Sequence, residues 1–316
     1  MIDERESADG LNGEIDTLVV KIGGAEAVDP EGVVSDVAHL VANGVRVVVV
    51  HGGSTAVDET LDAMDIDPEY VETPSGVSGR FTDEETMEAF TMAMAGSVNT
   101  DLVTKLQNVG VDAVGLSGVD GGLLTGPRKS AVRVLEDGRK KIKRGDHSGT
   151  IESVDTDLLD SLSAGGYVPV VTVPMLGEDD GELLPVNADA DRAAAAVAGA
   201  LDAPLVLLTD VAGVYADPDD PETLLSSVET PDEFDTLESA AEGFMSKKVL
   251  AVGEALESGS PAAVVADATL RDPVLAALDG GGTHVARSAV GDSAESAGSG
   301  STDSTGSTDQ SSEVGS

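Results

Sequence analysis

The sequence has no cysteine and no tryptophan, and only 2% of its 316 residues are aromatic. The absence of cysteine excludes disulfides, thiolate metal sites and a thiol nucleophile. Basic residues are scarce as well: 18 Lys and Arg stand against 59 Asp and Glu, which gives a formal charge of -41. Because a surface this acidic repels a phosphate backbone, we expect no nucleic-acid partner.

Long apolar runs are missing too. No stretch of 18 apolar residues occurs, so we expect no membrane partner, and the first residues, MIDERESADG, lack the apolar core of a signal peptide. These absences predict a cytoplasmic protein. The excess of carboxylates is typical of a halophile, because molar salt shortens the screening length to about 3 Å and relieves charge repulsion.

Composition divides the chain into three regions. Residues 1–16 are acidic and aperiodic, and we expect a flexible leader there. Residues 288–316 are rich in Ser, Gly and Asp and cannot bury enough apolar surface to offset their ordering entropy, which predicts a disordered tail. Residues 17–287 contain enough Val, Leu and Ala to build a packed domain.

Within residues 17–287, short Val- and Leu-rich runs alternate with helical patterns. Such runs are typical of strands buried on both faces, as in parallel sheets covered by helices. The order predicts an α/β fold, a three-layer α/β/α sandwich with a mainly parallel central sheet and ligands at the carboxyl ends of its strands. The expected strands are Leu18–Ile22, Val45–Val50, Val111–Leu116, Tyr167–Val173, Pro204–Leu208 and Pro261–Ala266. The expected helices are Glu31–Asn43, Ser54–Met64, Asp83–Val109, Asp155–Ala164, Ala190–Ala200 and Phe244–Ser258.

The segment from Lys129 to Lys143 breaks this alternation. An Asp-Gly pair between two short alternating runs predicts a protruding β-hairpin. Since no aromatic residue interrupts the basic run around it to stack on bases, an acidic protein is the expected partner. Eight of the 18 basic residues lie here within 17 positions, and only two acidic residues oppose them. The eight basic residues are Arg128, Lys129, Arg133, Arg139, Lys140, Lys141, Lys143 and Arg144.

Two glycine pairs follow predicted strands. Gly23 and Gly24 come after the strand that carries Lys21, and Gly52 and Gly53 come after the next strand. Glycine amides at a helix N-terminus can hold a phosphate, although such pairs also simply make tight turns. The sequence has no P-loop and no GxGxxG fingerprint after a strand, so a phosphate must be held in another way.

An acidic run opens the predicted helix that begins near residue 190. Asn187, Asp189 and Asp191 stand two residues apart. Any one of them is ordinarily a helix cap, but three exceed what capping needs. The strand after this helix leads into Thr209, Asp210 and Gly213 at the same expected edge of the sheet.

The motifs VVKIGG, VVVVHGGS, NADAD, LLTDVAGVY and GFMSKKV occur in this order within residues 17–287. This ordered set resembles the amino acid kinase family, in particular its acetylglutamate kinase branch. The segments GRFTDEETMEAFTMAMAG and VGLSGVDGGLLTGPRK are similar to kinases that act on glutamate or 2-aminoadipate attached to the carrier protein LysW. The resemblance implies a carbamate kinase-like fold that binds the amino acid and carrier in its N-terminal half and ATP from about residue 175 onward.

The resemblance also implies partners and residue roles. It implies ATP, Mg2+ held by the nucleotide phosphates, an acidic LysW carrier, a homodimer and a place in arginine or lysine biosynthesis. Lys21, Lys248 and Asp191 would be catalytic. Lys247 stays open as the alternative to Lys248, and Asp189 as the alternative to Asp191. The phosphate and ATP residues would be Gly23, Gly24, Gly53, Thr209, Asp210, Gly213 and Lys247. The substrate residues would be Gly52, Gly53, Arg80 and Asn187. The carrier-docking residues would be Arg128, Lys129, Arg139, Lys140, Lys141, Lys143 and Arg144.

A substrate carboxylate is already an anion at neutral pH, so phosphoryl transfer onto it requires no general base. Catalysis then depends on alignment and on positive charge around the transferring group. The sequence therefore predicts an ATP-dependent phosphotransferase that forms an acyl phosphate on carrier-bound glutamate or 2-aminoadipate. Two alternatives stay open: a kinase acting on free N-acetylglutamate, and a non-catalytic protein that senses nucleotides or amino acids.

Overall fold

The computed structural model describes residues 15–23, 30–72, 74, 78–136 and 139–291. Five parallel strands form the centre of the sheet: β1 (Thr17–Ile22), β2 (Arg46–His51), β9 (Val168–Asp179), β11 (Leu205–Thr209) and β13 (Ala262–Asp267). The other strands are β3 (Tyr70–Glu72), β4 (Ser78–Arg80), β5 (Ala113–Gly118), β6 (Leu124–Glu136), β7 (Arg139–Gly149), β8 (Ser153–Val154), β10 (Glu182–Val186), β12 (Ser227–Val228) and β14 (Thr283–Ala286).

The sheet is continuous over most of these strands. Its order is β12-β14-β13-β11-β1-β2-β9-β6-β7, with β5 and β10 also paired to β9, β8 paired to β6, and β3 and β4 forming a separate pair. The α-helices are α1 (Pro30–Ala42), α2 (Ser54–Ala63), α3 (Glu84–Thr91), α4 (Asn99–Asn108), α5 (Thr156–Ala164), α6 (Ala190–Ala200), α7 (Pro231–Ala240), α8 (Phe244–Glu257) and α9 (Pro273–Leu278).

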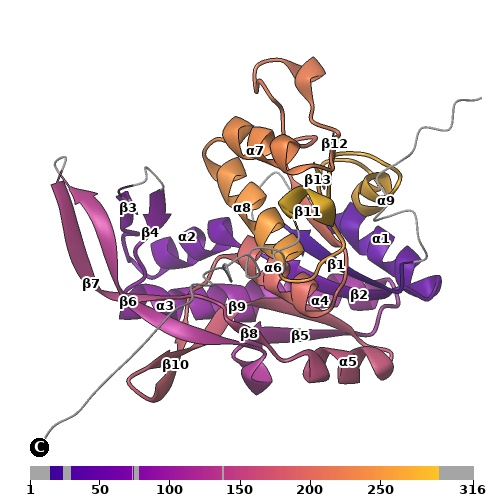
Figure 1. Cartoon of the computed structure of the whole chain (residues 1–316). Coiled ribbons are helices and arrows are strands. Elements are labelled where there is room, and N and C mark those ends of the chain that lie inside the picture. The colour runs from indigo at the N-terminus through magenta and orange to yellow at the C-terminus, as the bar shows by residue number, and fades with distance from the viewer. Residues whose placement is uncertain (1–14, 24–29, 73, 75–77, 137–138, 292–316) are drawn as a thin grey trace, which may run out of the picture.

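Helices cover both faces of the sheet (Figure 1). The alternation of side chains along each strand divides the core into two clusters. In β1, Val19 packs in the cluster that contains α6 and α8, whereas Val20 packs in the cluster that contains α1, α4 and α9. This arrangement confirms the predicted α/β/α sandwich with a mainly parallel sheet.

All six predicted strands and the predicted helices appear at the expected positions, with one internal difference. The expected helix Asp83–Val109 is three consecutive segments, since a π-helical stretch, η1 (Met92–Val98), separates α3 from α4. The predicted hairpin is also present: β6 and β7 pair antiparallel and extend away from the sheet (Figure 1). Its Asp-Gly turn lies outside the described residues.

The packed domain ends later than residue 287. Arg287–Val290 forms a short 3-10 helix, and Ala289 is 1% exposed. The predicted tail boundary is therefore wrong by about three residues, because a small apolar residue within a polar stretch gives a weak sequence signal. Residues 1–14 and 292–316, which hold most of the predicted leader and tail, lie outside the described part of the chain.

Candidate active site

Lys21 lies near the carboxyl end of β1, on the face of the sheet that α6 and α8 cover. Val19, two residues earlier, packs in the cluster with those helices, and side chains two apart on a strand share a face. The Lys21 side chain is almost fully buried, and its Nζ lies 2.5 Å from Oδ1 of Asp191. The ammonium group therefore lies inside the protein, at the carboxyl ends of the parallel strands, and not in solvent.

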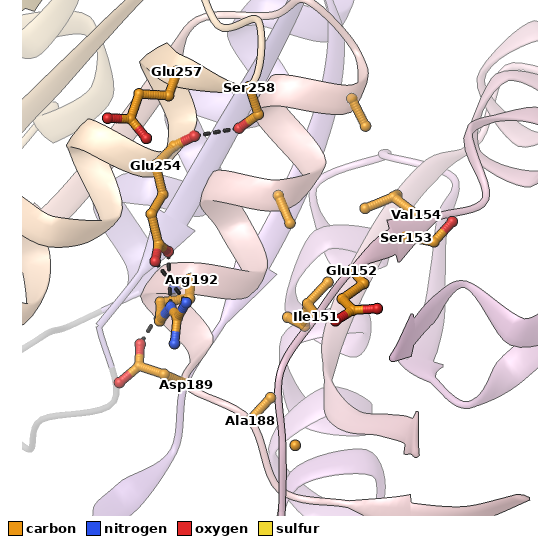
Figure 2. Close-up of a pocket in the computed structure, with 13 residues that line it drawn as sticks. Ile151, Glu152, Ser153, Val154, Ala188, Asp189, Arg192, Glu254, Glu257 and Ser258 are labelled. Atoms are coloured by element: carbon orange, nitrogen blue, oxygen red, sulfur yellow. Dashed lines mark hydrogen bonds and ion pairs between the residues drawn. The ribbon is translucent and has the colours of Figure 1, made fainter. Parts of the chain in front are cut away.

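Two aspartates at the start of α6 have different contacts. Asp189 caps the helix, since its Oδ1 accepts hydrogen bonds from the backbone N–H groups of Asp191 (2.9 Å) and Arg192 (3.3 Å). Figure 2 shows the contact between Asp189 and Arg192. Asp191 is 8% exposed and turns inward, with Oδ1 against Lys21 and Oδ2 3.1 Å from Nζ of Lys248. The carboxylate that joins the two lysines is thus that of Asp191.

The neighbouring lysines of α8 also separate. Successive residues of an α-helix point about 100° apart. Lys248 points to Asp191, whereas Nζ of Lys247 lies 5.8 Å from the ring centroid of Phe244, a side chain that is 82% exposed. The geometry therefore places Lys248, and not Lys247, opposite Lys21.

Burial and the neighbouring charges shift the pKa values of Lys21 and Asp191. Burial is the largest influence on Lys21 and lowers its pKa; Asp191 opposes this effect and Lys248 adds to it. Burial alone would raise the pKa of Asp191, but the two lysines outweigh it and hold this pKa below its usual range. With both lysines protonated the cluster has a net charge of +1, which suits a buried site for an anionic phosphoryl group.

An ion pair ties α6 to α8 close to this cluster. Arg192 donates from Nε and Nη2 to the two carboxylate oxygens of Glu254, at 2.7 and 2.6 Å (Figure 2). The pair faces a hollow of about 490 Å³ between α6, α8 and the chain from Gly149 to Val154. Lys21 and Lys248 do not line this hollow. It is therefore distinct from the lysine cluster.

The two glycine turns lie side by side, since Ile22 of β1 is in register with His51 of β2. Gly52 donates its N–H to the carbonyl oxygen of Ile22 (3.1 Å), so this amide is bonded within the protein. Gly53 is the N-cap residue of α2, and an added Cβ there would lie 2.8 Å from Sδ of Met94. Gly23 is half-buried at the end of β1, and Gly24 lies outside the described residues.

His51 holds the second turn in place. It is 1% exposed, with Nδ1 3.0 Å from the carbonyl oxygen of Gly52 and Nε2 3.0 Å from Nδ2 of Asn99. Burial lowers the pKa of His51 to about 4, and the charge of Lys21 contributes. The neutral imidazole therefore donates to Gly52 and accepts from Asn99, and no local sequence signal indicates the Asn99 contact.

Thr209 ends β11, a strand that pairs with β1, and Asp210 and Gly213 follow it. Thr209 is 5% exposed, and its hydroxyl donates to the exposed carboxylate of Asp210 (3.1 Å). An added Cβ on Gly213 would lie 2.6 Å from Oγ1 of Thr283, so the loop packs closely there. The predicted nucleotide residues thus lie at the same edge of the sheet as Lys21.

Arg80 ends β4, a strand that the sequence did not predict. Its Nη2 lies 2.6 Å from Oδ1 of Asp58 and 3.2 Å from the phenol oxygen of Tyr70, and the side chain is 9% exposed. Its Nε is buried and has no hydrogen-bond partner among the described residues. An unpaired buried donor is costly, and an incoming carboxylate would relieve that cost.

Asn187 comes from a distant part of the chain to the same region. Its Nδ2 donates to Oγ1 of Thr82 (3.1 Å), two residues beyond Arg80. Sequence reasoning missed Thr82, Asp58 and Tyr70, because their roles depend on contacts between segments far apart in the chain.

The basic hairpin has two kinds of cation. Lys143 turns toward the protein, with Nζ 4.1 Å from the ring centroid of Phe81 and an ion pair to Glu69. Arg128 is also engaged, since Nη1 lies 3.1 Å from Oδ2 of Asp179. Two members of the predicted docking set, Arg128 and Lys143, thus have contacts within the protein. The exposed members of the predicted set are Lys129, Arg139, Lys140, Lys141 and Arg144.

The outer face of the hairpin also carries an apolar side chain. Ile142 is 66% exposed and lies between Lys140 and Arg144 in the alternation of β7. Arg133 of β6 lies directly opposite Ile142 and is exposed as well. This face therefore combines three cations with an exposed aliphatic residue.

Among the described residues, no group of three or more His, Cys, Asp or Glu side chains could hold a metal ion. No helix in those ranges is both long and apolar enough to cross a bilayer.

Comparison with known proteins gives consistent matches. The amino acid kinase family matches residues 16–267. A LysW-aminoadipate kinase from Deinococcus radiodurans is 41% identical over 86% of this chain and 92% of its own length. An acetylglutamate kinase from Methanopyrus kandleri is 41% identical over 78% of this chain and 93% of its own length. In fold, the chain is similar to a carbamate kinase from Giardia lamblia bound to AMP-PNP, with a TM-score of 0.62, 15% identity and coverage of 86% and 98%.

Proposed function

Because this chain belongs to the amino acid kinase family, we propose that it uses ATP to phosphorylate the side-chain carboxylate of glutamate or 2-aminoadipate attached to the carrier protein LysW. The product is an acyl phosphate, the activated form of the acid in arginine or lysine synthesis. The names of the similar kinases support this substrate class.

A single observation carries the proposal. Asp191 holds the ammonium groups of Lys21 and Lys248 at 2.5 and 3.1 Å, although the two lysines come from β1 and α8. Phosphoryl transfer onto a carboxylate brings two anions together, and preorganised cations at the transferring group lower that barrier. A protein that only senses nucleotides has no need of two buried lysines around one aspartate.

The residues at this edge fit a bound ATP. Lys21 would contact the transferring phosphoryl group, and Lys248 would approach the nucleotide phosphates from the opposite side. Gly23, Thr209, Asp210 and Gly213 lie at the carboxyl ends of the adjacent strands β1 and β11. Mg2+ bound to the ATP phosphates neutralises part of their charge, and we propose that the phosphates and not a protein cluster hold it.

The substrate end lies at Arg80 and Asn187. We assign Arg80 to the carboxylate next to the amino group of the substrate, because its buried Nε lacks an acceptor. Asn187 lies on the other side of Thr82 and can supply amide contacts. The reacting carboxylate would then point toward Lys21.

The basic hairpin is the proposed docking surface for the acidic carrier. Lys140 and Arg144 flank the exposed Ile142, so charge can steer the encounter and an apolar contact can act at short range. We further propose that the enzyme is a homodimer, as the family resemblance implies, and that it acts in the cytoplasm.

A phosphorylation assay tests the proposal. Purified protein with MgATP is offered LysW charged with glutamate, LysW charged with 2-aminoadipate, and free N-acetylglutamate, in dilute and in concentrated KCl. We expect acyl phosphate, trapped as the hydroxamate, with one or both carrier substrates. Faster turnover of N-acetylglutamate than of both would favour the acetylglutamate alternative, and no ATP consumption with any acid would reject the kinase.

A further inference from the structure

Residue Thr82 links the two proposed substrate-binding residues to the base of the basic hairpin. We propose that Thr82 is a positioning residue, which fixes the side-chain amide of Asn187 and the chain beside Arg80 in the geometry that the acid substrate needs. This inference rests on the proposed function and extends it to a residue that the substrate does not touch.

All three polar groups of Thr82 are bonded within the protein, and the residue is fully buried. Its N–H donates to Oδ1 of Asp146 (3.1 Å), and its carbonyl oxygen accepts from the N–H of His147 (2.6 Å). Its hydroxyl accepts from Nδ2 of Asn187 (3.1 Å). Two of these partners belong to β7 and the third precedes α6, so Thr82 joins three separate segments of the chain.

The base of the hairpin holds Asn187 as well. The N–H of Asn187 donates to the carbonyl oxygen of His147 (2.7 Å), and its carbonyl oxygen accepts from the N–H of Gly149 (2.8 Å). The backbone of Asn187 is thus fixed by β7, and the Thr82 hydroxyl fixes the rotation of its side-chain amide. An amide with a bonded NH2 group presents its oxygen in one direction only.

Thr82 also affects the position of Arg80. The two residues are two positions apart in an extended segment, and Phe81 between them is buried beneath Lys143. Asp58 and Tyr70 hold the guanidinium itself. The bonds of Thr82 to β7 fix the backbone that follows Arg80, so movement at the hairpin base would reach both substrate contacts.

A purely structural role of Thr82 and a positioning role lead to different changes in stability and in KM when the residue is replaced. Loss of a structural contact lowers the melting temperature and leaves the Michaelis constants of the two substrates in their former ratio. Loss of a positioning contact raises the KM of the acid substrate and leaves the KM of ATP unchanged, because Lys21 and Lys248 are not bonded to Thr82.

The test compares Thr82→Val with Thr82→Ser. Valine keeps the shape but removes the acceptor for Asn187, whereas serine keeps the hydroxyl. With charged LysW as substrate, we expect Thr82→Val to raise the KM of the acid by about fivefold to tenfold, the effect of one lost hydrogen bond. The KM of ATP should stay within about twofold of the wild type in both variants, and Thr82→Ser should restore the acid KM.

Equal behaviour of the two variants, or a parallel rise in both KM values, would overturn the positioning role. Should Thr82→Val not fold, Thr82→Ala tests the same bond, because its smaller side chain leaves room beside the Asn187 amide, and the same two criteria apply. Wild-type turnover separates this inference from the proposed function. If the wild type phosphorylates no acid, the proposed function fails; if it is active and Thr82→Val leaves the acid KM unchanged, only the role of Thr82 fails.

Discussion

The two ends of the proposed site handle positive charge in opposite ways. At the phosphate end, Lys21 and Lys248 are buried around one carboxylate. On the hairpin, Lys140 and Arg144 lie exposed on either side of an apolar residue. Buried charge is costly to hold but acts strongly at short range, whereas exposed charge acts over the screening length and steers encounters. The difference suggests a phosphate end built for the reaction itself and a hairpin built for a partner that arrives from solution.

The largest loss of activity is expected from a substitution of Asp191, the carboxylate at the phosphate end. Asp191→Asn would leave the ammonium groups of Lys21 and Lys248 close together without the carboxylate that joins them. We expect turnover to fall about 100-fold to 1,000-fold, the usual cost of disturbing one preorganised charge at a reacting group. Initial rates at saturating ATP and acid measure the effect.

The matched control is Asp189→Asn, two residues earlier. Asparagine caps a helix as well as aspartate does, and Asp189 does not touch either lysine. We expect its turnover to stay within about threefold of the wild type. Equal losses in the two variants would contradict the assignment of the central carboxylate to Asp191.

The next largest effect is expected when the protein is titrated with acid. This titration tests the burial of the His51 imidazole near the phosphate end. The pKa of His51 is about 4 in the folded protein against 6.5 when unperturbed. As the pH falls, the unfolded chain therefore takes up the proton at a higher pH than the folded protein does. The free energy of unfolding then decreases between about pH 6.5 and pH 4, by about 3 kcal/mol from this group. Denaturant unfolding should show less stability loss over this window in His51→Gln than in the wild type. A His51→Gln slope equal to that of the wild type would count against the buried neutral imidazole.

Charge reversal on the hairpin tests the other end. The double variant Lys140→Glu, Arg144→Glu should raise the KM of the charged carrier about tenfold in dilute salt and less in concentrated salt, because the exposed charges are screened. The KM of ATP and the rate with N-acetylglutamate, if it reacts, should not change. Arg271→Glu controls for net charge alone, since Arg271 is 94% exposed and lies beside α9. An unchanged carrier KM would reject docking on this face.

The fold was predictable because its signals are local. Val- and Leu-rich runs such as Val47–Val50 specify buried strands, and α7 was also within reach, since Thr230 and Glu233 form a capping box with Pro231 at the helix start. The roles proposed for Lys21 and Asp191 came from the family resemblance of the ordered motifs.

The contacts around Thr82 were not predictable. They join residues 64 and 105 positions apart, and nothing in either local segment indicates the partner. A count of charges in the sequence likewise does not distinguish the exposed cations of the hairpin from those that turn inward. Whether a lysine points to solvent or to a ring is decided by what packs against the strand, as the inward turn of Lys143 shows.

The smallest predicted effect distinguishes the two kinds of hairpin cation. Lys143→Met removes the contacts to Phe81 and Glu69, and we expect a loss of about 1 kcal/mol of unfolding free energy with little change in carrier KM. Lys140→Met should do the reverse and leave stability unchanged while it raises the carrier KM. Thermal unfolding and carrier kinetics measured on the same two proteins check both halves. If Lys143→Met weakens carrier binding as much as Lys140→Met does, the inward cation also takes part in docking, and the division of the hairpin into a structural face and a binding face is wrong.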